Sequence, residues 1–337
     1  MKIIFLFVFA CFTFHNTYAQ SGGYANYRFL DLPYSARNMG MANVNIATHD
    51  ADVQTVALNP SSLNSQMHNI GGATFTSYFA GIKYGQVVYA HSKGKHTIAA
   101  GIQYLNYGKF VETDAGGNTI GNFGGRDMSV NLSYAQQLDS SWSVGLTTKL
   151  LSSALERYTS FAAAIDAGVT YRSKDKLFGA ALVVKNLGKT LNNFTSVKDK
   201  LSTQVAIGLN VKPQYLPLTF HFLIHDLQRF DLSYKDTRPL PTNNSLTGDT
   251  IIYKKNIGDK ITRHLTLGAE LNLGKSLTVR LGYDFLKRKD MVFENRKSTV
   301  GFSWGIGINL KKFSLQLGRA NYYLKSSPTT FSINYQF

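Results

Sequence analysis

The chain has 337 residues, a formal net charge of +16 and one cysteine, Cys11. A single cysteine excludes a disulfide-stapled domain, so stability has to come from packing or from a membrane. Aromatic residues make up 13% of the sequence, and 29 glycines stand beside only seven prolines. This composition favours many short strands, arranged as a sandwich or a barrel.

The first residues have the pattern of a secretory signal peptide, residues 1–19. Lys2 is followed by twelve apolar or near-apolar residues, 3–14, and then by a polar stretch ending at Ala19. Twelve residues are too few to span a bilayer of about 30 Å as a helix, so we expect cleavage after Ala19. The alternative is a lipoprotein signal with Cys11 as the lipidated residue, which leaves only about seven apolar residues for its hydrophobic part.

The positive charge bears on the partners of a secreted protein. Nucleic acid is not an expected partner outside the cytoplasm, whereas anionic lipid headgroups attract Lys and Arg. The alternative is that the charge only keeps the protein soluble.

Residues 70–337 repeat one pattern, in which about ten residues alternate between apolar and polar before a break. Val130, Leu132 and Tyr134, for example, alternate with Asn131 and Ser133. A period of two is strand geometry, and a length near ten suits a tilted strand that crosses a membrane. Fourteen such segments predict an all-β protein, a 14-stranded antiparallel transmembrane β-barrel. They lie at 70–79, 82–92, 95–107, 126–137, 141–152, 161–173, 177–187, 201–212, 216–227, 263–273, 276–287, 298–310, 313–323 and 329–337.

The connections between these segments alternate between short and long. Residues 93–94 and 138–140 are short connections, 108–125 is a long one, and 228–262 is the longest. Outer-membrane barrels have short periplasmic turns and longer extracellular loops. We therefore expect both ends of the barrel to be periplasmic, with 228–262 as a large extracellular loop. The last segment alternates up to Phe337, so we expect it to pair with the first strand and close the barrel.

Several charged and polar residues occupy the polar face of these strands. A Lys or Arg on the lipid face at mid-membrane costs about 2–4 kcal/mol, so we expect these residues to point into the lumen. They are Lys149, Asp166, Arg172, Lys185, Gln204, Arg280 and Asp284.

Residues 20–69 do not alternate, and part of this segment resembles a known family. The stretch 35–63, "SARNMGMANVNIATHDADVQTVALNPSSL", is similar to the N-terminal string of FadL-like outer-membrane proteins. The matching residues are Gly40, Met41, Asp50, Ala51, Asp52, Asn59, Pro60 and Leu63, whereas Ser61 and Ser62 stand where that family usually has Ala and Gly. The resemblance implies a 14-stranded barrel whose lumen is plugged by residues 20–69, with Asn59 and Pro60 as the plug motif.

A second resemblance spans essentially the whole chain and is carried by residues 22–46 and 215–234. These stretches look like an outer-membrane component of the Bacteroidetes type IX secretion system. That resemblance implies a role in the attachment complex at the cell surface. The implied partners are a PorZ-like surface protein, a PorU-like sortase and a PorV-like shuttle, beside the anionic lipopolysaccharide of the outer membrane.

The residues offer little material for catalysis. His221 and His225 share the inward face of one segment, which is the usual place of a structural histidine. The carboxylates of Asp50 and Asp52 precede an apolar run, where they more often cap a helix than bind a cation. The glycine-rich stretch 116–125 lacks the following Lys and helix of a phosphate loop. We therefore predict a protein that is not an enzyme and uses neither a cofactor nor a metal.

Two functions remain open, a structural adaptor for surface partners and a FadL-like uptake channel for an apolar solute. The loops favour the adaptor, because mixed basic and aromatic surfaces suit protein interfaces. The predicted partner-binding residues in 228–262 are Arg229, Phe230, Tyr234, Ile251, Ile252, Tyr253 and Lys254. Lys287, Arg288 and Lys289, at the end of a strand, are predicted to contact lipopolysaccharide or other headgroups.

Overall fold

A computed structural model gives the fold and describes residues 25–194, 200–233, 257–274, 276–291, 298–322 and 327–337. The predicted signal peptide lies outside these residues. Fourteen antiparallel strands form one closed barrel in which neighbours in sequence are neighbours in space. They are β1 Ile70–Ser77, β2 Lys83–Lys93, β3 His96–Thr113, β4 Thr119–Gln137, β5 Trp142–Leu155, β6 Tyr158–Arg172, β7 Phe178–Asn192, β8 Gln204–Val211, β9 Leu218–Ile224, β10 Leu265–Leu273, β11 Leu277–Asp284, β12 Phe302–Asn309, β13 Phe313–Ala320 and β14 Thr329–Gln336. The predicted fold and strand number are confirmed.

The barrel closes between its first and last strands. β1 pairs with β14 from Ile70 opposite Gln336 to Ser77 opposite Thr329. The backbone N–H of Phe337 donates to the carbonyl of Asn69 at 3.0 Å, which extends the seam by one further bond. Because the sheet has no open edge along this seam, the backbone groups of both strands are paired.

The wall is apolar outside and polar inside, the reverse of a soluble domain. Outward Leu132 and Leu150 are 61% and 65% exposed, whereas inward Thr147 and Asp166 are 3% and 0% exposed. Period-two alternation produces this division, because successive side chains point to opposite sides of a strand. Of the residues predicted to point inward, Lys149 and Asp166 form an ion pair at 2.6 Å with both side chains at most 5% exposed. The outer surface is the kind expected of a barrel that faces lipid.

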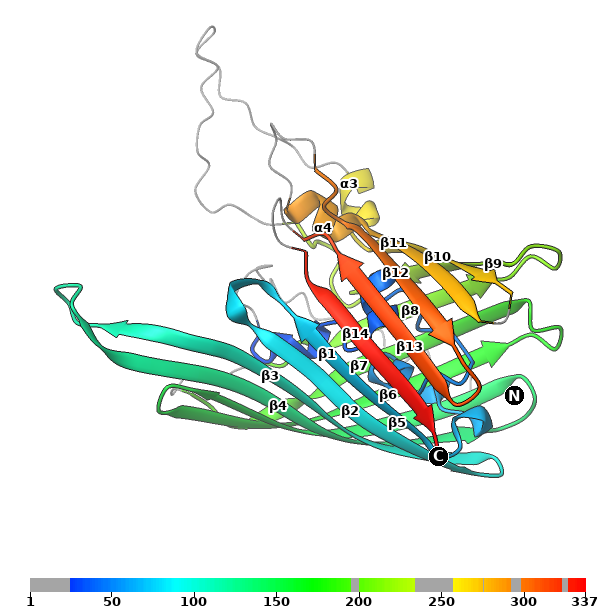
Figure 1. The fold of residues 1–337 in the computed structure, drawn as a ribbon, viewed down its shortest axis with the longest axis horizontal. Helices are drawn as coiled ribbons and strands as arrows, with labels where there is room; N and C mark the ends of the chain where they lie inside the picture. Colours follow the sequence, from blue (N-terminus) through cyan, green and yellow to red (C-terminus); the bar gives the residue numbers. More distant parts are fainter. Residues whose placement is uncertain (1–24, 195–199, 234–256, 275, 292–297, 323–326) are drawn as a thin grey trace, which may run out of the picture.

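One side of the barrel is taller than the sequence pattern predicts. β3 and β4 have 18 and 19 residues, whereas β8 to β14 have between 7 and 9. The predicted loop 108–125 is mostly strand, and β3 and β4 continue pairing up to Thr113 opposite Thr119. Phe110 and Phe123 stack across this hairpin with ring centroids 5.2 Å apart. The alternation of β-forming residues therefore outweighs the glycines that suggested a loop. Figure 1 shows this hairpin extending well beyond the rest of the wall.

Residues 25–69 lie inside the barrel as a chain of short helical turns. These are η1 Arg28–Asp31, α2 Ala36–Gly40, η2 Val53–Ala57, η3 Pro60–Ser62 and η4 Ser65–Met67. All five residues of α2 are buried. The approach to the wall is close, because a Cβ on Gly318 would overlap with the carbonyl of Ala36. Glycines on the inner wall thus make room for the backbone of this segment.

The described residues contain three further helical elements outside the lumen segment. η5 Phe79–Gly81 connects β1 to β2, while α3 Ile257–Thr262 precedes β10 and α4 Phe285–Asp290 follows β11. Within the described residues, none of the helices has the length and hydropathy needed to cross a membrane.

Candidate functional site

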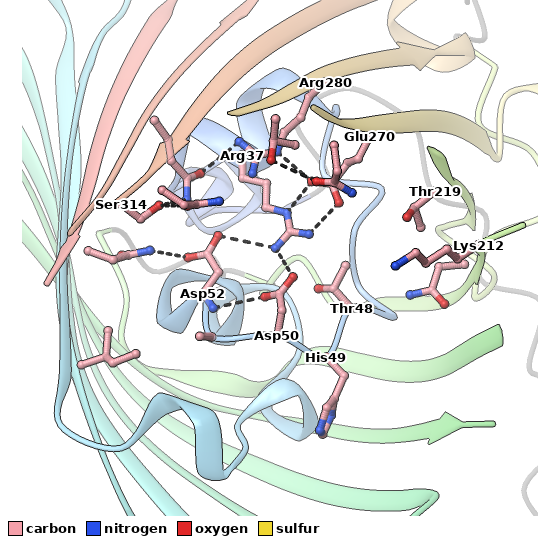
Figure 2. Close-up of a pocket in the computed structure, with 18 of the residues that line it drawn as sticks. Arg37, Thr48, His49, Asp50, Asp52, Lys212, Thr219, Glu270, Arg280 and Ser314 are labelled. Atoms are coloured by element: carbon pink, nitrogen blue, oxygen red, sulfur yellow. Dashed lines mark hydrogen bonds and ion pairs between the residues drawn. The ribbon is translucent and has the colours of Figure 1, made fainter. Parts of the chain in front are cut away.

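The lumen segment is held by a buried ion network around Arg37 of α2 (Figure 2). The guanidinium of Arg37 donates to both carboxylate oxygens of Glu270 on β10, with distances of 2.9 and 2.7 Å. It also donates to Asp50 at 2.6 Å and lies 3.7 Å from Asp52. Arg280 of β11 donates to the same Glu270 at 2.7 Å. Arg37, Glu270 and Arg280 side chains are at most 7% exposed, so the charges are neutralised by one another rather than by water.

Asp52 connects this network to the closing strand β14. Its side chain caps η2 by accepting from the N–H of Gln54 at 3.2 Å, as the sequence analysis predicts for a carboxylate in this position. The same oxygen accepts from the Asn334 amide at 2.9 Å, and Gln54 in turn donates to Asn334 at 2.7 Å. A local helix cap thus also fastens the segment to the wall.

The predicted plug motif, Asn59 and Pro60, forms a second anchor on the opposite wall. The Asn59 amide donates to the carbonyl of Ile46 at 2.8 Å and to the hydroxyl of Thr170 on β6 at 2.9 Å. Its oxygen caps η3 by accepting from the N–H of Ser61 at 2.9 Å. Pro60 occupies the first position of η3, where its missing N–H leaves no bond unmade. A Cβ on Gly145 of β5 would overlap with the Pro60 backbone, so this turn lies directly against the wall.

Two cavities lie on either side of the lumen segment. One of about 550 Å³ is lined by Arg37, Asp50 and Glu270 and by residues of the short turns after β6, β8 and β12. The other, of about 210 Å³, is lined by residues at the opposite end, including Leu232 and Asp290. Ala47 lines the larger cavity and its neighbour Ile46 lines the smaller one. The backbone of residues 46–47 therefore stands between them.

At the end of the barrel away from the short turns, α3 and α4 lie near each other (Figure 1), and charge pairs join this region. Lys289 of α4 lies 2.6 Å from the carboxylate of Asp259 on α3 and also donates to the hydroxyl of Thr262. Arg263 donates to Asp259 at 2.9 Å and pairs with Asp290. The hydrogen bond from Lys289 lowers the pKa of Asp259 below its ordinary value, and Arg263 acts in the same direction.

The other two residues predicted to contact headgroups also have partners within the chain. Lys287 pairs with Asp284 at 2.9 Å and lies over the ring of Tyr322, 4.8 Å from its centroid. Arg288 donates to the carbonyl of Ser298. Lys287, Arg288 and Lys289 thus fasten α4 to its surroundings, and their contact with lipopolysaccharide stays a prediction.

The predicted partner-binding residues are only partly within the described chain. Phe230 is 64% exposed, and Lys260 of α3 lies 6.0 Å from its ring centroid. Arg229 lines the smaller cavity. Tyr234, Ile251, Ile252, Tyr253 and Lys254 lie outside the described residues, so the binding surface stays a prediction.

The two histidines of β9 and its end point inward as predicted. His221 is 1% exposed with its Nε2 atom 3.5 Å from Glu270, and His225 is 8% exposed and 2.8 Å from Asp226. Within the described residues, no three His, Cys, Asp or Glu side chains gather as a metal site would require. Each histidine thus lies beside a carboxylate.

The sequence alone does not predict the pairing of Arg37 with Glu270. Arg37 stands within the FadL-like stretch, and Glu270 is an isolated acid on the inward face of its strand. An inward carboxylate in an apolar-alternating strand signals that an opposite charge lies nearby, because an unpaired buried charge is costly. The sequence offers several inward cations and does not say which one is the partner.

Comparisons with known proteins agree with the barrel. No family model and no curated protein matches this sequence. Among solved structures, the Pseudomonas putida toluene transporter TodX is similar with a TM-score of 0.51 and 11% identity, over 90% of this chain and 97% of that chain. A Pseudomonas aeruginosa FadL homologue is similar with a TM-score of 0.51 and 9% identity, over 90% and 98% of the two chains. The chain therefore has the fold of the FadL-type outer-membrane barrels.

Proposed function

We propose that this chain is a PorQ-like outer-membrane barrel and a non-enzymatic scaffold in the attachment complex of a type IX secretion system. Its apolar outer wall and polar interior support a place in the outer membrane. The taller wall and the α3–α4 end are, in this proposal, the extracellular side, and the short turns and both termini are periplasmic. PorZ-like, PorU-like and PorV-like proteins are the proposed partners.

The observation that carries the scaffold reading is the buried network around Arg37. Residues 25–69 act as a plug that is fixed to β10 by Glu270 and to β6 by Asn59. Moving the plug aside would separate several buried charges, each of which costs several kcal/mol to leave unpaired (roughly 3–5 kcal/mol for one broken pair). A rigid interior suits a protein that presents its outer end to others.

The alternative is an uptake channel for an apolar small molecule, since TodX, which has a similar fold, is a toluene transporter. An apolar solute is bound best by apolar walls with few polar groups. The larger cavity here is lined by seven basic and three acidic residues, which does not favour such a solute. An uptake channel is therefore the second candidate function, and the deletion experiment distinguishes it from a scaffold.

A loop deletion tests whether the barrel holds a surface partner at the membrane. Deleting residues 235–258, of which only Ile257 and Gly258 at the start of α3 are within the described structure, is expected to release the surface partner into the medium while the barrel keeps its heat-modifiable migration on gels. A partner that stays bound would place the adaptor surface elsewhere. Loss of uptake of an apolar compound as the only defect would favour the channel.

The headgroup prediction has its own variant and control. Replacing Lys287, Arg288 and Lys289 with Gln is expected to weaken lipopolysaccharide co-purification and to spare the partner, since each basic residue near an anionic lipid surface is worth about 1 kcal/mol. Replacing Lys93, Lys95 and Lys174, at the short-turn end, removes the same charge and is expected to leave lipopolysaccharide bound. Equal loss of lipopolysaccharide from both variants would mean that total positive charge, rather than these three residues, determines the binding.

A further inference from the structure

The larger cavity has an excess of positive charge that nothing within the described chain neutralises. Its lining contains seven Lys and Arg residues and three acidic residues. The smaller cavity, at the other end of the barrel, is lined by four basic and four acidic residues. The two cavities on either side of residues 46–47 therefore differ in charge. Of the two, the larger cavity at the short turns has the surplus of positive charge.

The surplus is located at the mouth of the cavity rather than at its floor. At the floor, Asp50 and Glu270 are bound by Arg37, and Glu270 also accepts from Arg280. Asp52 accepts from Asn334 and lies near the same guanidinium. All three carboxylates of the lining thus already have a cation or an amide donor.

Five basic residues line the mouth of the cavity. Within the described part of the chain, none of them forms an ion pair with a carboxylate. Four are exposed lysines on the short turns, and the fifth is a half-buried arginine at the end of β6. They are Arg172, Lys176, Lys212, Lys311 and Lys312.

These five cations are divided between two sides of the mouth. Arg172, Lys176 and Lys212 belong to β6 and to the turns after β6 and β8, whereas Lys311 and Lys312 form the turn after β12. The turns after β6 and β12 are six strands apart in a ring of fourteen, so they lie almost opposite one another. Figure 2 shows Lys212 beside Thr219, on the far side of the cavity from Asp52 and Ser314.

From this arrangement we infer that the cavity at the short turns binds an acidic polypeptide segment of a partner protein. A ligand that contacts both sides of the mouth needs several anionic groups separated along its length, which a single small anion lacks. Lysine is a mobile point charge suited to carboxylates in varied positions, whereas a phosphate site more often uses Arg forks or a cradle of backbone N–H groups. A volume near 550 Å³ is within the range of about 300–1,000 Å³ typical of ligand sites.

The inference goes beyond the surface scaffold, because it adds a partner at the opposite end of the barrel. That this partner is periplasmic rests on the proposed orientation. Binding of the acidic segment does not depend on that orientation, since it can be measured on the purified protein. Its failure would therefore leave the scaffold proposal in place.

The experiment uses the full-length protein in nanodiscs of uncharged lipid and a fluorescein-labelled hexaglutamate peptide as the probe. We expect saturable binding by fluorescence anisotropy, weakened by added salt, with no binding of a hexalysine peptide. Replacing Lys212, Lys311 and Lys312 with Gln is expected to weaken binding by about tenfold, the effect of losing three exposed charge contacts.

Replacing Lys93, Lys95 and Lys174 with Gln is the matched control. Lys93 is the last residue of β2, and Lys95 and Lys174 are on short turns of the same end; none of the three lines the cavity. Binding is therefore expected to stay within about twofold of the wild type. Equal weakening in both variants, or no saturable binding to the wild type, would overturn the inference. Tighter binding of inorganic pyrophosphate than of the peptide would assign the cavity to a small polyanion instead. Loss of peptide binding when anionic lipid is added would assign the cations to headgroups.

Discussion

Arg37 of α2 and Glu270 of β10 form a two-pronged ion pair across the interior of the barrel, at 2.9 and 2.7 Å. Both side chains are at most 7% exposed. A guanidinium that meets a carboxylate through two parallel bonds fixes orientation as well as distance. The pair therefore sets both the depth and the rotation of the lumen segment relative to the wall.

Breaking this pair is expected to destabilise the barrel strongly. Arg37→Met leaves Glu270 and Asp50 with fewer cations in a buried site, a change that costs roughly 3–5 kcal/mol. The temperature at which the folded gel band disappears should fall clearly. Arg157→Met is the control, because Arg157 is 77% exposed and its contacts are with its chain neighbours, an ion pair with Glu156 and the ring of Tyr158 at 5.8 Å. That control should change the temperature little.

A double variant tests whether the charge pair itself is responsible. Arg37→Met combined with Glu270→Leu removes both charges, so its loss of stability should be smaller than the sum of the two single losses. Strictly additive losses would mean that the two side chains act independently.

Asn59→Ala is expected to loosen the other anchor. The substitution removes the donors to Ile46 and Thr170 and the cap of η3, and it leaves buried groups unpaired at about 1–3 kcal/mol each. Lower melting temperature and lower surface abundance should follow, and combining it with Pro60→Ala should deepen the loss. Asn118→Ala, at an exposed hairpin tip, is the comparison. Unchanged melting of the Asn59 variant would mean that the motif has no structural role.

Cysteine labelling tests the proposed orientation. Asn118→Cys, at the tip of the β3–β4 hairpin, should react with a membrane-impermeant maleimide on intact cells, whereas Lys174→Cys, on the β6–β7 turn, should not. Thr147→Cys serves as a negative control, because Thr147 is 3% exposed and points to the inside of the barrel. Labelling of Lys174→Cys but not of Asn118→Cys would reverse the orientation.

The contact between α3 and α4 should depend on pH. The pKa of Asp259 is lowered in the folded protein, so its contribution to stability is fully present above the unfolded pKa of about 3.9 and is lost as the pH falls through the lower folded value. In hydrogen–deuterium exchange, the protection factors of residues 257–262, which correct for the intrinsic pH dependence of amide exchange, should therefore stay constant from neutral pH down to about pH 4 and fall below it. Lys289→Gln removes the main cause of the shift and should move this fall to higher pH. An unchanged profile would mean that Lys289 does not hold α3.

The alternation of side chains along the strands predicted a large part of this structure. It assigned Lys149 and Asp166 to the inside and Leu132 and Leu150 to the outside, because membrane strands divide polar and apolar residues by parity. The number of strands followed from counting the alternating segments. The lengths of β3 and β4 were predicted less well. The glycines around Phe110 and Phe123 suggested a loop, whereas the hairpin continues there.

Contacts between distant parts of the chain could not be predicted in the same way. Parity places Glu270 and Arg280 on the inner face, but it does not say which residue of the lumen segment lies opposite them. Arg37 and Glu270 are 233 positions apart in sequence, and their meeting depends on barrel closure and on the path of the segment. The two cavities likewise arise from that path rather than from any local pattern.

The strand that closes the barrel also holds the lumen segment. Ser332 on β14 accepts from the N–H of Ala36 at 2.8 Å, and Asn334, two residues further along the same face, bonds with Gln54 and Asp52. β14 reaches β1 at the seam. The closing strand therefore contacts both the first strand of the barrel and the lumen segment. Closure around an empty lumen would leave Asn334 without its bonds to Gln54 and Asp52 and Glu270 without Arg37, so we expect placement of the segment and sealing of the barrel to stabilise each other.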